Sequence, residues 1–283
     1  VFVWIFYELL YSIIHKHHVL SKIYNELDLM GIDATSIKLN LPFSSYGHYS
    51  LTNTTEKGIK IYLAALLGRF TIHLTAMVTP MNVNDSNEFD DLLTDTGMFV
   101  DLQKVILVFD RGYWSLKRFK YLTKNGIRFI TPLKRGVKYK ILTKNKEKRW
   151  EEENTEIEFT SLPRFKVRLV FVHDEDKELF YVTNIRDISP EEIHHCYKQR
   201  WDMEILNKDL RLNLKIDHFI GKNLNAVLIQ IFTPLIAYLL IALFRIFYNS
   251  FLSIREIKRV LKYYSHQSLQ EARRVHPMLC SCR

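Results

Sequence analysis

Three acidic residues occupy positions where carboxylates are unusual, and together they could support metal-assisted chemistry. Asp33 lies inside the apolar run MGIDATSI, and Asp110 ends the apolar run VILVFD. Glu204 lies in YKQRWDMEILNKDLRLNLK, among several lysines and arginines. Carboxylates in or at the end of buried strands are costly unless something pairs with them. For either aspartate taken alone, a capping or turn role explains the sequence equally well.

The three acids together indicate a more specific chemistry. Strand ends are where open α/β sheets place their active sites, so Asp33, Asp110 and Glu204 can converge at one sheet edge. Three hard oxygen donors with open positions suit Mg²⁺ or Mn²⁺, which bind a few carboxylates together with phosphate oxygens. Two such ions can activate the attacking oxygen of a phosphodiester reaction and stabilise the leaving oxygen.

The segment 197–215 reads as an amphipathic helix with one acid in a cationic face. At about 100° per residue, the polar side chains fall within an arc of roughly 80°. They are Arg200, Glu204, Lys208, Arg211 and Lys215, with Met203, Leu206, Leu210 and Leu214 on the opposite side. A solvated face with a Glu204–Lys208 ion pair is the alternative interpretation. If the three acids bind metal, the cations would instead hold the DNA backbone beside the ions.

The composition supports a folded basic protein with an anionic partner. The chain has 283 residues, 47% of them hydrophobic, and a formal net charge of +9. This charge favours nucleic acid or a membrane surface as the partner, and the apolar content excludes a disordered chain. Its three cysteines, Cys196, Cys280 and Cys282, give neither a disulfide framework nor a metal-binding spacing. We therefore expect a reduced cytoplasmic protein, associated with the nucleoid if DNA is the partner.

One stretch, 226–244, could be mistaken for a membrane span. Its apolar run, Ile231 to Phe244, is interrupted only by Thr233 and Pro234. This run is short for a bilayer and ordinary for a fully buried helix, so we expect a buried helix and no membrane partner. The sequence begins with Val, which indicates either an alternative start codon or a missing N-terminal segment.

The order of predicted elements indicates an α/β fold with a mixed sheet flanked by helices. Periodicity predicts strands over 29–40, 58–68, 70–80, 104–110 and 127–135, and helices over 1–28, 85–95 and 115–126. Three consecutive strands followed by strand–helix alternation is the order of a ribonuclease-H-like core. Residues 136–187 read as a β-rich insertion before the last acid, and helices follow over 190–215, 223–248 and 253–264. This predicts a discontinuous catalytic domain (1–135 and 188–265), the insertion and a tail (266–283).

At these residues the sequence resembles the DDE transposases of bacterial and archaeal insertion sequences, in the insertion-sequence-four group. IDATSI is similar to the strand of the first acid, and FDRGYWSLKRFKYLTKNGIRFITPLK closely matches the Asp-Arg-Gly-Tyr segment of the second. YKQRWDMEILNKDLR matches the Tyr-x2-Arg-x3-Glu-x6-Lys signature, with Arg211 in place of the signature lysine. DHFIGKNLNAVLIQIFTPLIAYLL resembles the helix that follows, which favours burial over a membrane span.

The resemblance implies a mechanism and a set of roles. Asp33, Asp110 and Glu204 would hold two Mg²⁺ (or Mn²⁺) ions, DNA would be cut at the element ends, and the freed 3′-hydroxyl would attack target DNA. Enzymes of this kind act as homodimers on paired ends. The predicted DNA contacts are Arg111, Tyr197, Arg200, Trp201, Lys208 and Arg211. Tyr197 could equally pack on the core, and burial of Trp201 against the insertion is favoured over stacking on a base.

Several alternatives stay open at this point. The same three acids would serve a ribonuclease-H-like nuclease that cuts without strand transfer. A folded, inactive transposase remnant that only binds DNA, or a membrane-anchored basic protein using 226–244, would also carry these patterns. The basic run 134–150 could follow the DNA backbone or form a solvated hairpin.

Overall fold

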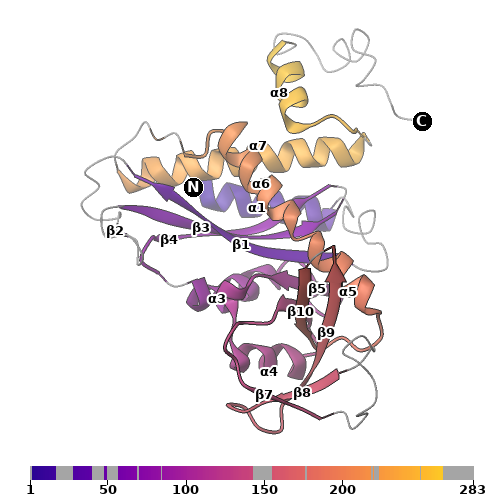
Figure 1. Ribbon diagram of the computed structural model, residues 1–283. Helices are drawn as coiled ribbons and strands as arrows, with labels where there is room; N and C mark the ends of the chain where they lie inside the picture. Colours follow the sequence, from indigo (N-terminus) through magenta and orange to yellow (C-terminus); the bar gives the residue numbers. More distant parts are fainter. Residues whose placement is uncertain are drawn as a thin grey trace.

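A single mixed sheet organises the molecule. The computed structural model describes residues 2–16, 28–39, 48–49, 57–68, 70–83, 85–142, 155–175, 177–217, 219, 223–248 and 250–263. Within these ranges ten strands form one sheet in the order β2-β3-β1-β5-β6-β10-β9-β8-β7, with β4 also paired to β3 (Figure 1). The strands of the first half are β1 (Asp28–Lys38), β2 (His48–Tyr49), β3 (Lys57–Leu67), β4 (Ile72–Pro80), β5 (Val105–Phe109) and β6 (Arg128–Pro132).

The centre of the sheet places the two aspartates next to each other. β1 pairs antiparallel with β3, and β3 pairs antiparallel with β4, as the predicted meander requires. β1 pairs in parallel with β5, in a register that sets Ile32 opposite Phe109. The next residues on these adjacent strands are Asp33 and Asp110. The backbone register therefore brings the two aspartates to neighbouring positions, and their role in one site stays a prediction.

Helices cover both faces of this sheet. Figure 1 shows α1 (Phe2–Lys16), α6 (Trp201–Leu212) and α7 (Leu224–Phe247) on one face and α3 (Asp85–Thr96) on the other. α4 (Leu116–Lys124) packs against β6. β3 and β5 consist mainly of Val, Ile, Leu and Ala, as expected for strands that are covered on both faces.

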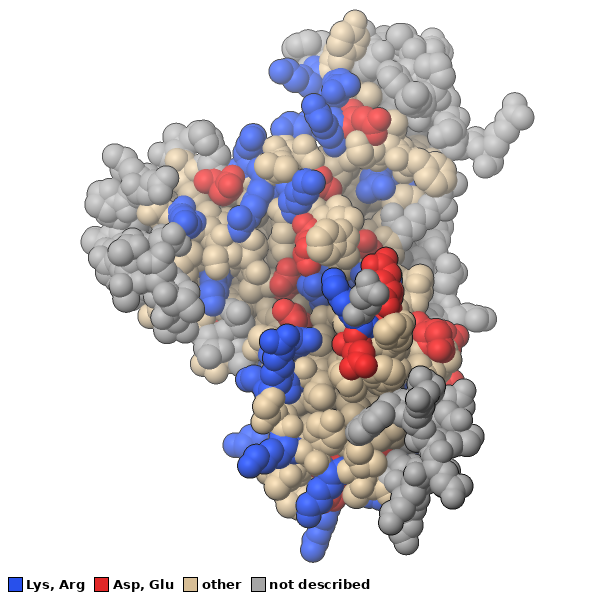
Figure 2. Space-filling view, in the orientation of Figure 1, with Lys and Arg blue, Asp and Glu red and all other residues tan. Residues whose placement is uncertain are grey.

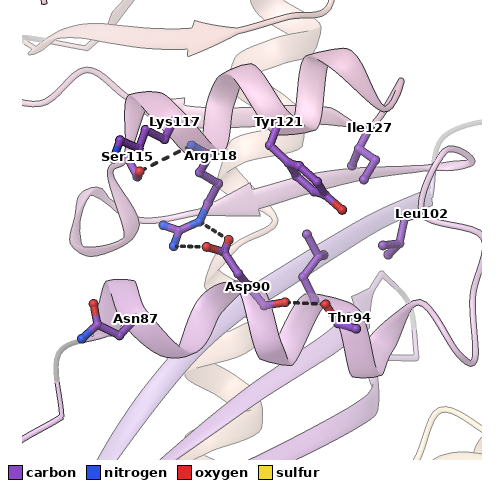
Figure 3. Close-up of a pocket in the computed structure, with 10 residues that line it drawn as sticks. Asn87, Asp90, Thr94, Leu102, Ser115, Lys117, Arg118, Tyr121 and Ile127 are labelled. Carbon is purple, nitrogen blue, oxygen red and sulfur yellow. Dashed lines mark hydrogen bonds and ion pairs between the residues drawn. The ribbon is translucent and has the colours of Figure 1, made fainter.

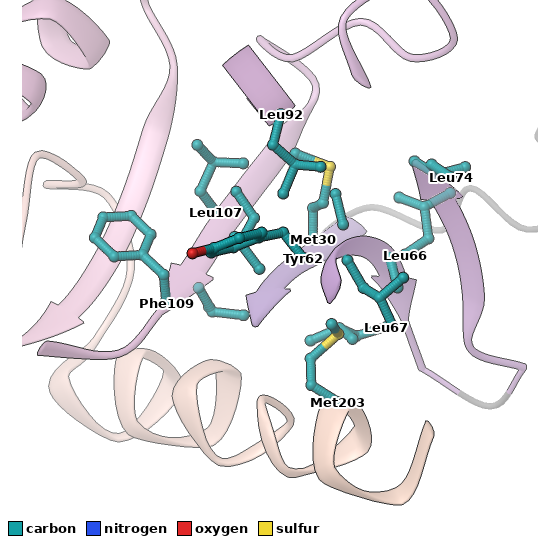
Figure 4. Close-up of a cluster of buried hydrophobic side chains, with 14 of the residues drawn as sticks. Met30, Tyr62, Leu66, Leu67, Leu74, Leu92, Leu107, Phe109 and Met203 are labelled. Carbon is teal, nitrogen blue, oxygen red and sulfur yellow. The ribbon is translucent and has the colours of Figure 1, made fainter. Parts of the chain in front are cut away.

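The core is dense around the strands that carry the acids. Figure 4 shows Met30, Tyr62, Leu107 and Phe109 meeting Leu92 of α3 on one side of the sheet. These five side chains have no measurable solvent exposure. The hydroxyl end of Tyr62 reaches the chain after β4, where it donates to the Val83 carbonyl oxygen at 3.5 Å. This packing fixes the two strands that carry the acids, with Asp33 in the middle of β1 and Asp110 directly after β5.

The predicted β-rich insertion continues the same sheet. Its strands are β7 (Tyr139–Ile141), β8 (Thr155–Phe159), β9 (Lys166–Asp174) and β10 (Lys177–Thr183). β10 pairs antiparallel with β6, and each earlier strand of the insertion pairs with the next. The division into 136–187 and a discontinuous catalytic domain stays a prediction. Residues 143–150 of the basic run and the whole predicted tail, 266–283, lie outside the described residues.

The prediction of a single helix over 190–215 is wrong in one respect, because this segment forms two helices. α5 (Pro190–Lys198) begins at a capping box formed by Ser189 and Glu192 and ends before Gln199. α6 then starts at Trp201. The Arg200 and Met203 backbone N–H groups donate three residues back, to Tyr197 and Arg200, so the chain tightens and turns here. α6 ends at Leu212, and Lys215, at φ 58°, lies beyond the helix that was predicted to carry it.

The C-terminal helices follow the prediction closely. α7 is long and apolar enough to cross a membrane by length and composition alone, and 56% of its most apolar window is buried within the protein. It packs on α1, β4 and α6. Burial is one-sided, because Ile229 and Leu240 face outward, so the expectation of a fully buried helix holds for one face only. α8 (Ile254–Tyr263) follows. α1 ends at Lys16, and Asp28 already belongs to β1.

Candidate active site

Asp33 lies in the sixth position of β1, half-buried between the adjacent strands and α6. Burial raises the pKa of its carboxyl group from 3.8 to about 6. A backbone hydrogen bond at Ala34 and the charge of Arg200 lower this pKa, whereas the charges of Glu204 and Asp110 raise it. Asp33 therefore experiences the electrostatic field of both other predicted acids, which places all three in one neighbourhood.

Asp110 directly follows the last residue of β5, and it is exposed. Its Oδ1 accepts a hydrogen bond from the Arg111 backbone N–H at 2.6 Å, which makes it the N-cap of a short 3₁₀ helix (Arg111–Tyr113). The capping role considered from the sequence is therefore present. One carboxylate oxygen caps the turn, and a carboxylate has further lone pairs for another partner.

α6 reaches the acids because a glycine lets it approach β1 closely. A Cβ atom at Gly31 would lie 2.6 Å from Met203 Cγ and 2.9 Å from Met203 Sδ. Met203 itself is fully buried, and Figure 4 shows it projecting from α6 beneath the sheet, near Leu67. The contact sets the residues after Met203 alongside the residues after Gly31. The next turns of α6 therefore run along β1 from Asp33 onward, as the contacts of Asn207 and Arg211 show.

Two hydrogen-bonded contacts connect this face of α6 to β1. Asn207 Nδ2 donates to Asp33 Oδ2 at 3.0 Å. One turn further, Arg211 Nη2 donates to Thr35 Oγ1 and to the Ser36 carbonyl oxygen. Arg211, predicted as a phosphate contact, thus has one end of its guanidinium engaged with β1. Its Nε is buried and has no hydrogen-bond partner among the described residues.

Glu204 forms its ion pair with Arg200, one turn earlier on the chain. Arg200 Nη2 lies 2.9 Å from Glu204 Oε1, with the arginine side chain 19% exposed and the glutamate 38%. Among the described ion pairs none joins Glu204 to Lys208, so the predicted i,i+4 pair is replaced by one in the other direction. Arg200 Nε is buried without a partner in the described residues.

The donor set suits a hard divalent cation. Asp33, Asp110 and Glu204 supply carboxylate oxygens, and the Asn207 side chain adds an amide. Burial is the main cause of the raised pKa of Asp33, and the charges of Glu204 and Asp110 raise it further. Among the described residues, however, no three His, Cys, Asp or Glu side chains are close enough to form a ready metal cluster. Glu204 is turned towards Arg200 in this structure, so it would have to exchange that partner for a cation.

Comparison with known proteins agrees with this geometry. Residues 26–240 match the family described as "Transposase DDE domain". The chain belongs to this DDE transposase family. The match begins just before β1 and ends within α7, so it includes every residue of the candidate site. The resemblance to insertion-sequence transposases inferred from the motifs is confirmed.

The curated relatives of this transposase-family chain are bacterial. It is 32% identical over 146 residues to a putative transposase for insertion sequence element IS4SA from Synechocystis, covering 49% of this chain and 40% of that protein. It is 26% identical over 179 residues to putative transposase y4zB from Sinorhizobium fredii, covering 58% and 47%. The chain therefore spans less than half the length of these relatives.

A solved structure supports the fold. The chain is similar to a protein in the cryo-EM structure of a piggyBac transposase synaptic complex with hairpin DNA, with a TM-score of 0.54 and 13% sequence identity. The likeness covers 91% of this chain and 56% of the other. This confirms the predicted ribonuclease-H-like α/β fold of the DDE-family chain, with a mixed sheet flanked by helices.

Two aromatic residues of the signature have distinct environments in this DDE-family chain. Tyr197 is half-buried, its ring 5.0 Å from that of Tyr181 and 5.7 Å from the Arg200 guanidinium carbon. Packing on the sheet, one of its two predicted roles, is therefore present. Trp201 is 60% exposed, so its predicted burial against the insertion is wrong. The turn at Gln199 and Arg200 starts a new helix at Trp201 and directs its ring to solvent.

Sequence reasoning missed Asn207 and a network behind Tyr197. The Tyr181 hydroxyl lies 2.8 Å from His194 Nδ1, and His194 Nε2 lies 3.3 Å from Asp174, which also pairs with Lys198. This network joins β9 and β10 to α5. The signal for Asn207 was present but weak, since it is a polar residue at the border between the cationic and apolar faces of the helix.

One face of the molecule carries basic side chains on both sides of a group of acidic ones. Figure 2 shows acidic side chains gathered near the middle of the molecule, with lysines and arginines above and below them. Lys208, Arg111 and the described cations of the basic run (Lys134, Arg135, Lys138 and Lys140) are exposed. The predicted DNA contacts at Lys208 and Arg111 thus have accessible charges, and their role stays a prediction.

A separate cleft of about 610 Å³ lies between α3 and α4. Figure 3 shows Arg118 extended across it to Asp90, with a distance of 2.7 Å between Nε and Oδ1. The Arg118 guanidinium also lies 4.2 Å from the Phe89 ring centre. Its described lining residues include none of the predicted site residues. The ion pair joins α3 to α4 beneath the sheet, which is a structural role.

Proposed function

We propose that this chain carries the catalytic site of an insertion-sequence transposase that cuts DNA at the element ends and joins them to target DNA. The observation that carries the proposal is the register of β1 and β5, which sets Asp33 and Asp110 on neighbouring strands with Glu204 of α6 within electrostatic reach of Asp33. Family membership supports the same reaction class.

Asp33, Asp110 and Glu204 would hold Mg²⁺ or Mn²⁺, two ions by analogy with the family. When bound, these ions would activate the attacking oxygen and neutralise the leaving oxygen of the scissile phosphodiester. The protein contributes rigid placement, because β1 and β5 are fully paired and α6 is fixed against Gly31. Such placement turns a bimolecular displacement into an effectively intramolecular one.

Arg200 is the group best placed to connect the acids with DNA. Its Nη2 neutralises Glu204, and its buried Nε has no partner in the described residues. When a cation replaces it beside Glu204, the guanidinium can turn to a phosphate, for which its planar fork is well suited. Arg211 is tied to β1 through Nη2, and its buried Nε has no hydrogen-bond partner among the described residues. Both arginines would bind the phosphates near the cut.

The remaining proposed DNA contacts are side chains that are exposed to solvent. Lys208 and Arg111 lie at the surface beside the acids and would neutralise backbone phosphates. The exposed Trp201 ring would stack on a base that leaves the duplex. Each phosphate contact contributes about 0.9 to the slope of log K against log salt concentration. Lys208→Gln should therefore lower that slope by about one unit without changing the fold.

The test is an assay on labelled duplexes that carry the terminal sequences of the element encoding this chain, with Mg²⁺ and unlabelled target DNA. We expect nicking at the ends and joined products from the unsubstituted chain, and neither from Glu204→Gln. Glu191→Gln, at an exposed acid on α5, serves as the matched control and should retain both activities. Joined products that survive Glu204→Gln would refute the assignment.

Two other results would each select a competing function. Cleavage without joined products would favour a nuclease of the same fold. Binding to DNA without cleavage by the unsubstituted chain would favour a remnant that only binds. We also expect two copies on a pair of ends, which sizing of the protein–DNA complex by light scattering would test. A complex with one copy for each pair of ends would contradict the homodimer.

A further inference from the structure

Asn207 has an unusual hydrogen-bonding environment. It lies on α6 one turn after Glu204, and its Nδ2 donates to Asp33 Oδ2 at 3.0 Å. Its own carbonyl oxygen, Oδ1, is buried and accepts no hydrogen bond from any residue that the structure describes. A buried acceptor without a donor is costly, so such a group in a folded protein calls for a partner.

The orientation of the amide is fixed by chemistry. An ionised carboxylate can only accept hydrogen bonds, so the amino group of Asn207 must face Asp33. Rotating the amide by half a turn would set two oxygen atoms against each other. The carbonyl oxygen therefore has to point away from Asp33 Oδ2, and the side chain cannot satisfy Oδ1 by flipping. The missing partner must come from outside the described residues.

We propose that Asn207 Oδ1 is a further oxygen ligand of the divalent cation held by Asp33, directly or through one water molecule. The inference rests on the proposed function and adds to it a residue outside the three acids. An amide oxygen is a hard donor of the kind that Mg²⁺ and Mn²⁺ accept. The same side chain holds Asp33 through its amino group, so one residue both orients an acid and binds its ion.

A neutral ligand suits this position. Asp33, Asp110 and Glu204 already bring three negative charges to one neighbourhood, and the substrate phosphates bring more. A fourth carboxylate would add repulsion against DNA, whereas an amide adds an oxygen without charge. Arg200 and Arg211 flank Asn207 along the chain, and their buried Nε atoms likewise have no hydrogen-bond partner among the described residues. These donors would be available to substrate phosphate on the helix that carries Asn207.

The experiment measures Mn²⁺ binding to the full chain by electron paramagnetic resonance, without DNA and without turnover. Asn207→Leu keeps the size of the side chain and removes both polar ends. Asn207→Asp keeps an oxygen and removes the amino group. Asn213→Leu is the matched control, because Asn213 Nδ2 donates to Asp209 Oδ1 at 2.6 Å in the same kind of pair at the end of α6. Melting temperatures establish that each variant folds.

We expect Asn207→Leu to weaken Mn²⁺ binding by about 10- to 100-fold, as loss of metal-orienting partners commonly does. Asn207→Asp should bind Mn²⁺ at least as tightly as the unsubstituted chain, because it presents an oxygen with added charge. Asn213→Leu should leave the affinity unchanged. A residue that only braces Asp33 would instead give equal losses in both Asn207 variants, and that result would overturn the proposal.

Two further outcomes also count against it. Unchanged Mn²⁺ affinity in Asn207→Leu would show that Oδ1 does not serve the ion, and an equal loss in Asn213→Leu would show a general effect of α6. Asp33→Asn distinguishes failure of the proposed Asn207 ligand from failure of the proposed metal site. If Asp33→Asn loses Mn²⁺ binding while Asn207→Leu keeps it, only the role of Asn207 fails. If Asp33→Asn keeps Mn²⁺ binding, the metal site of the proposed function fails as well.

Discussion

Replacing Asp33 with asparagine should stabilise the protein at neutral pH while removing its proposed activity. Burial raises the pKa of this carboxyl group from 3.8 to about 6 in the folded state. Below about pH 4 the carboxyl group is protonated in both the folded and the unfolded chain, so it does not alter stability. Between about pH 4 and 6 the unfolded chain releases its proton first, and stability falls as pH rises. Above about pH 6 the full penalty is present.

The size of the effect follows from the shift. About two pH units, at about 1.36 kcal/mol each, give roughly 3 kcal/mol as an upper limit. Asp33 is only half-buried, and solvent screening reduces this, so we expect about 1 to 3 kcal/mol at pH 7. For a chain of this size that corresponds to roughly 2 to 5 °C in melting temperature. Asparagine keeps the shape and still accepts from Asn207 Nδ2, so packing should not change.

The assay is thermal unfolding of both proteins across the same pH range. The gain in melting temperature from Asp33→Asn should be small near pH 4, grow towards pH 6 and then stay constant. Asp101→Asn, at an exposed carboxylate outside the candidate site, is the matched control for the loss of one acid. Added Mg²⁺ should raise the melting temperature of the unsubstituted chain only, because a ligand stabilises the state that binds it. A gain independent of pH, or a loss of stability at pH 7, would refute the reasoning.

Three further substitutions test how the fold positions the site. Gly31→Ala places a Cβ atom 2.6 Å from Met203 Cγ, so we expect the free energy of unfolding to fall by about 1–3 kcal/mol and Mn²⁺ binding to weaken. Unchanged Mn²⁺ binding would show that other contacts place α6. Ser189→Ala removes the N-cap of α5 and should cost about 1 kcal/mol in chemical denaturation without affecting Mn²⁺ affinity. Arg200→Lys keeps the charge but loses the planar fork, so DNA cleavage should fall more than DNA binding; equal losses would contradict a role at the scissile phosphate.

The acids were predictable because their signal is local. Asp33 and Asp110 each interrupt or end an apolar run, and a carboxylate in such a place is visible in one sequence. Parallel pairing of their strands then brings them together, and this pairing follows from the strand–helix order between them. The capping box at Ser189 was predictable for the same reason, since its two members lie three residues apart.

The helix boundary at Arg200 was not predictable on these grounds. Gln199 and Arg200 are ordinary helix formers, and no glycine or proline marks the turn between α5 and α6. Tertiary contacts decide it, because Tyr197 packs on Tyr181 of β10 whereas Met203 packs on Gly31 of β1. These two strands are separated by β5 and β6 in the sheet, so α5 and α6 pack over different parts of it. The exposed Trp201 is a consequence of the same turn.

The role of Asn207 depends on a distance that no spacing in the sequence contains. Its amide meets Asp33 only because Gly31 allows α6 to approach β1, two residues before the acid. A larger residue at 31 would move the helix outward and separate Asn207, Glu204 and Arg211 from β1 together. One glycine therefore sets the distance between the strand that carries the first acid and the helix that carries the last. The site is defined by this packing contact as much as by the acids themselves.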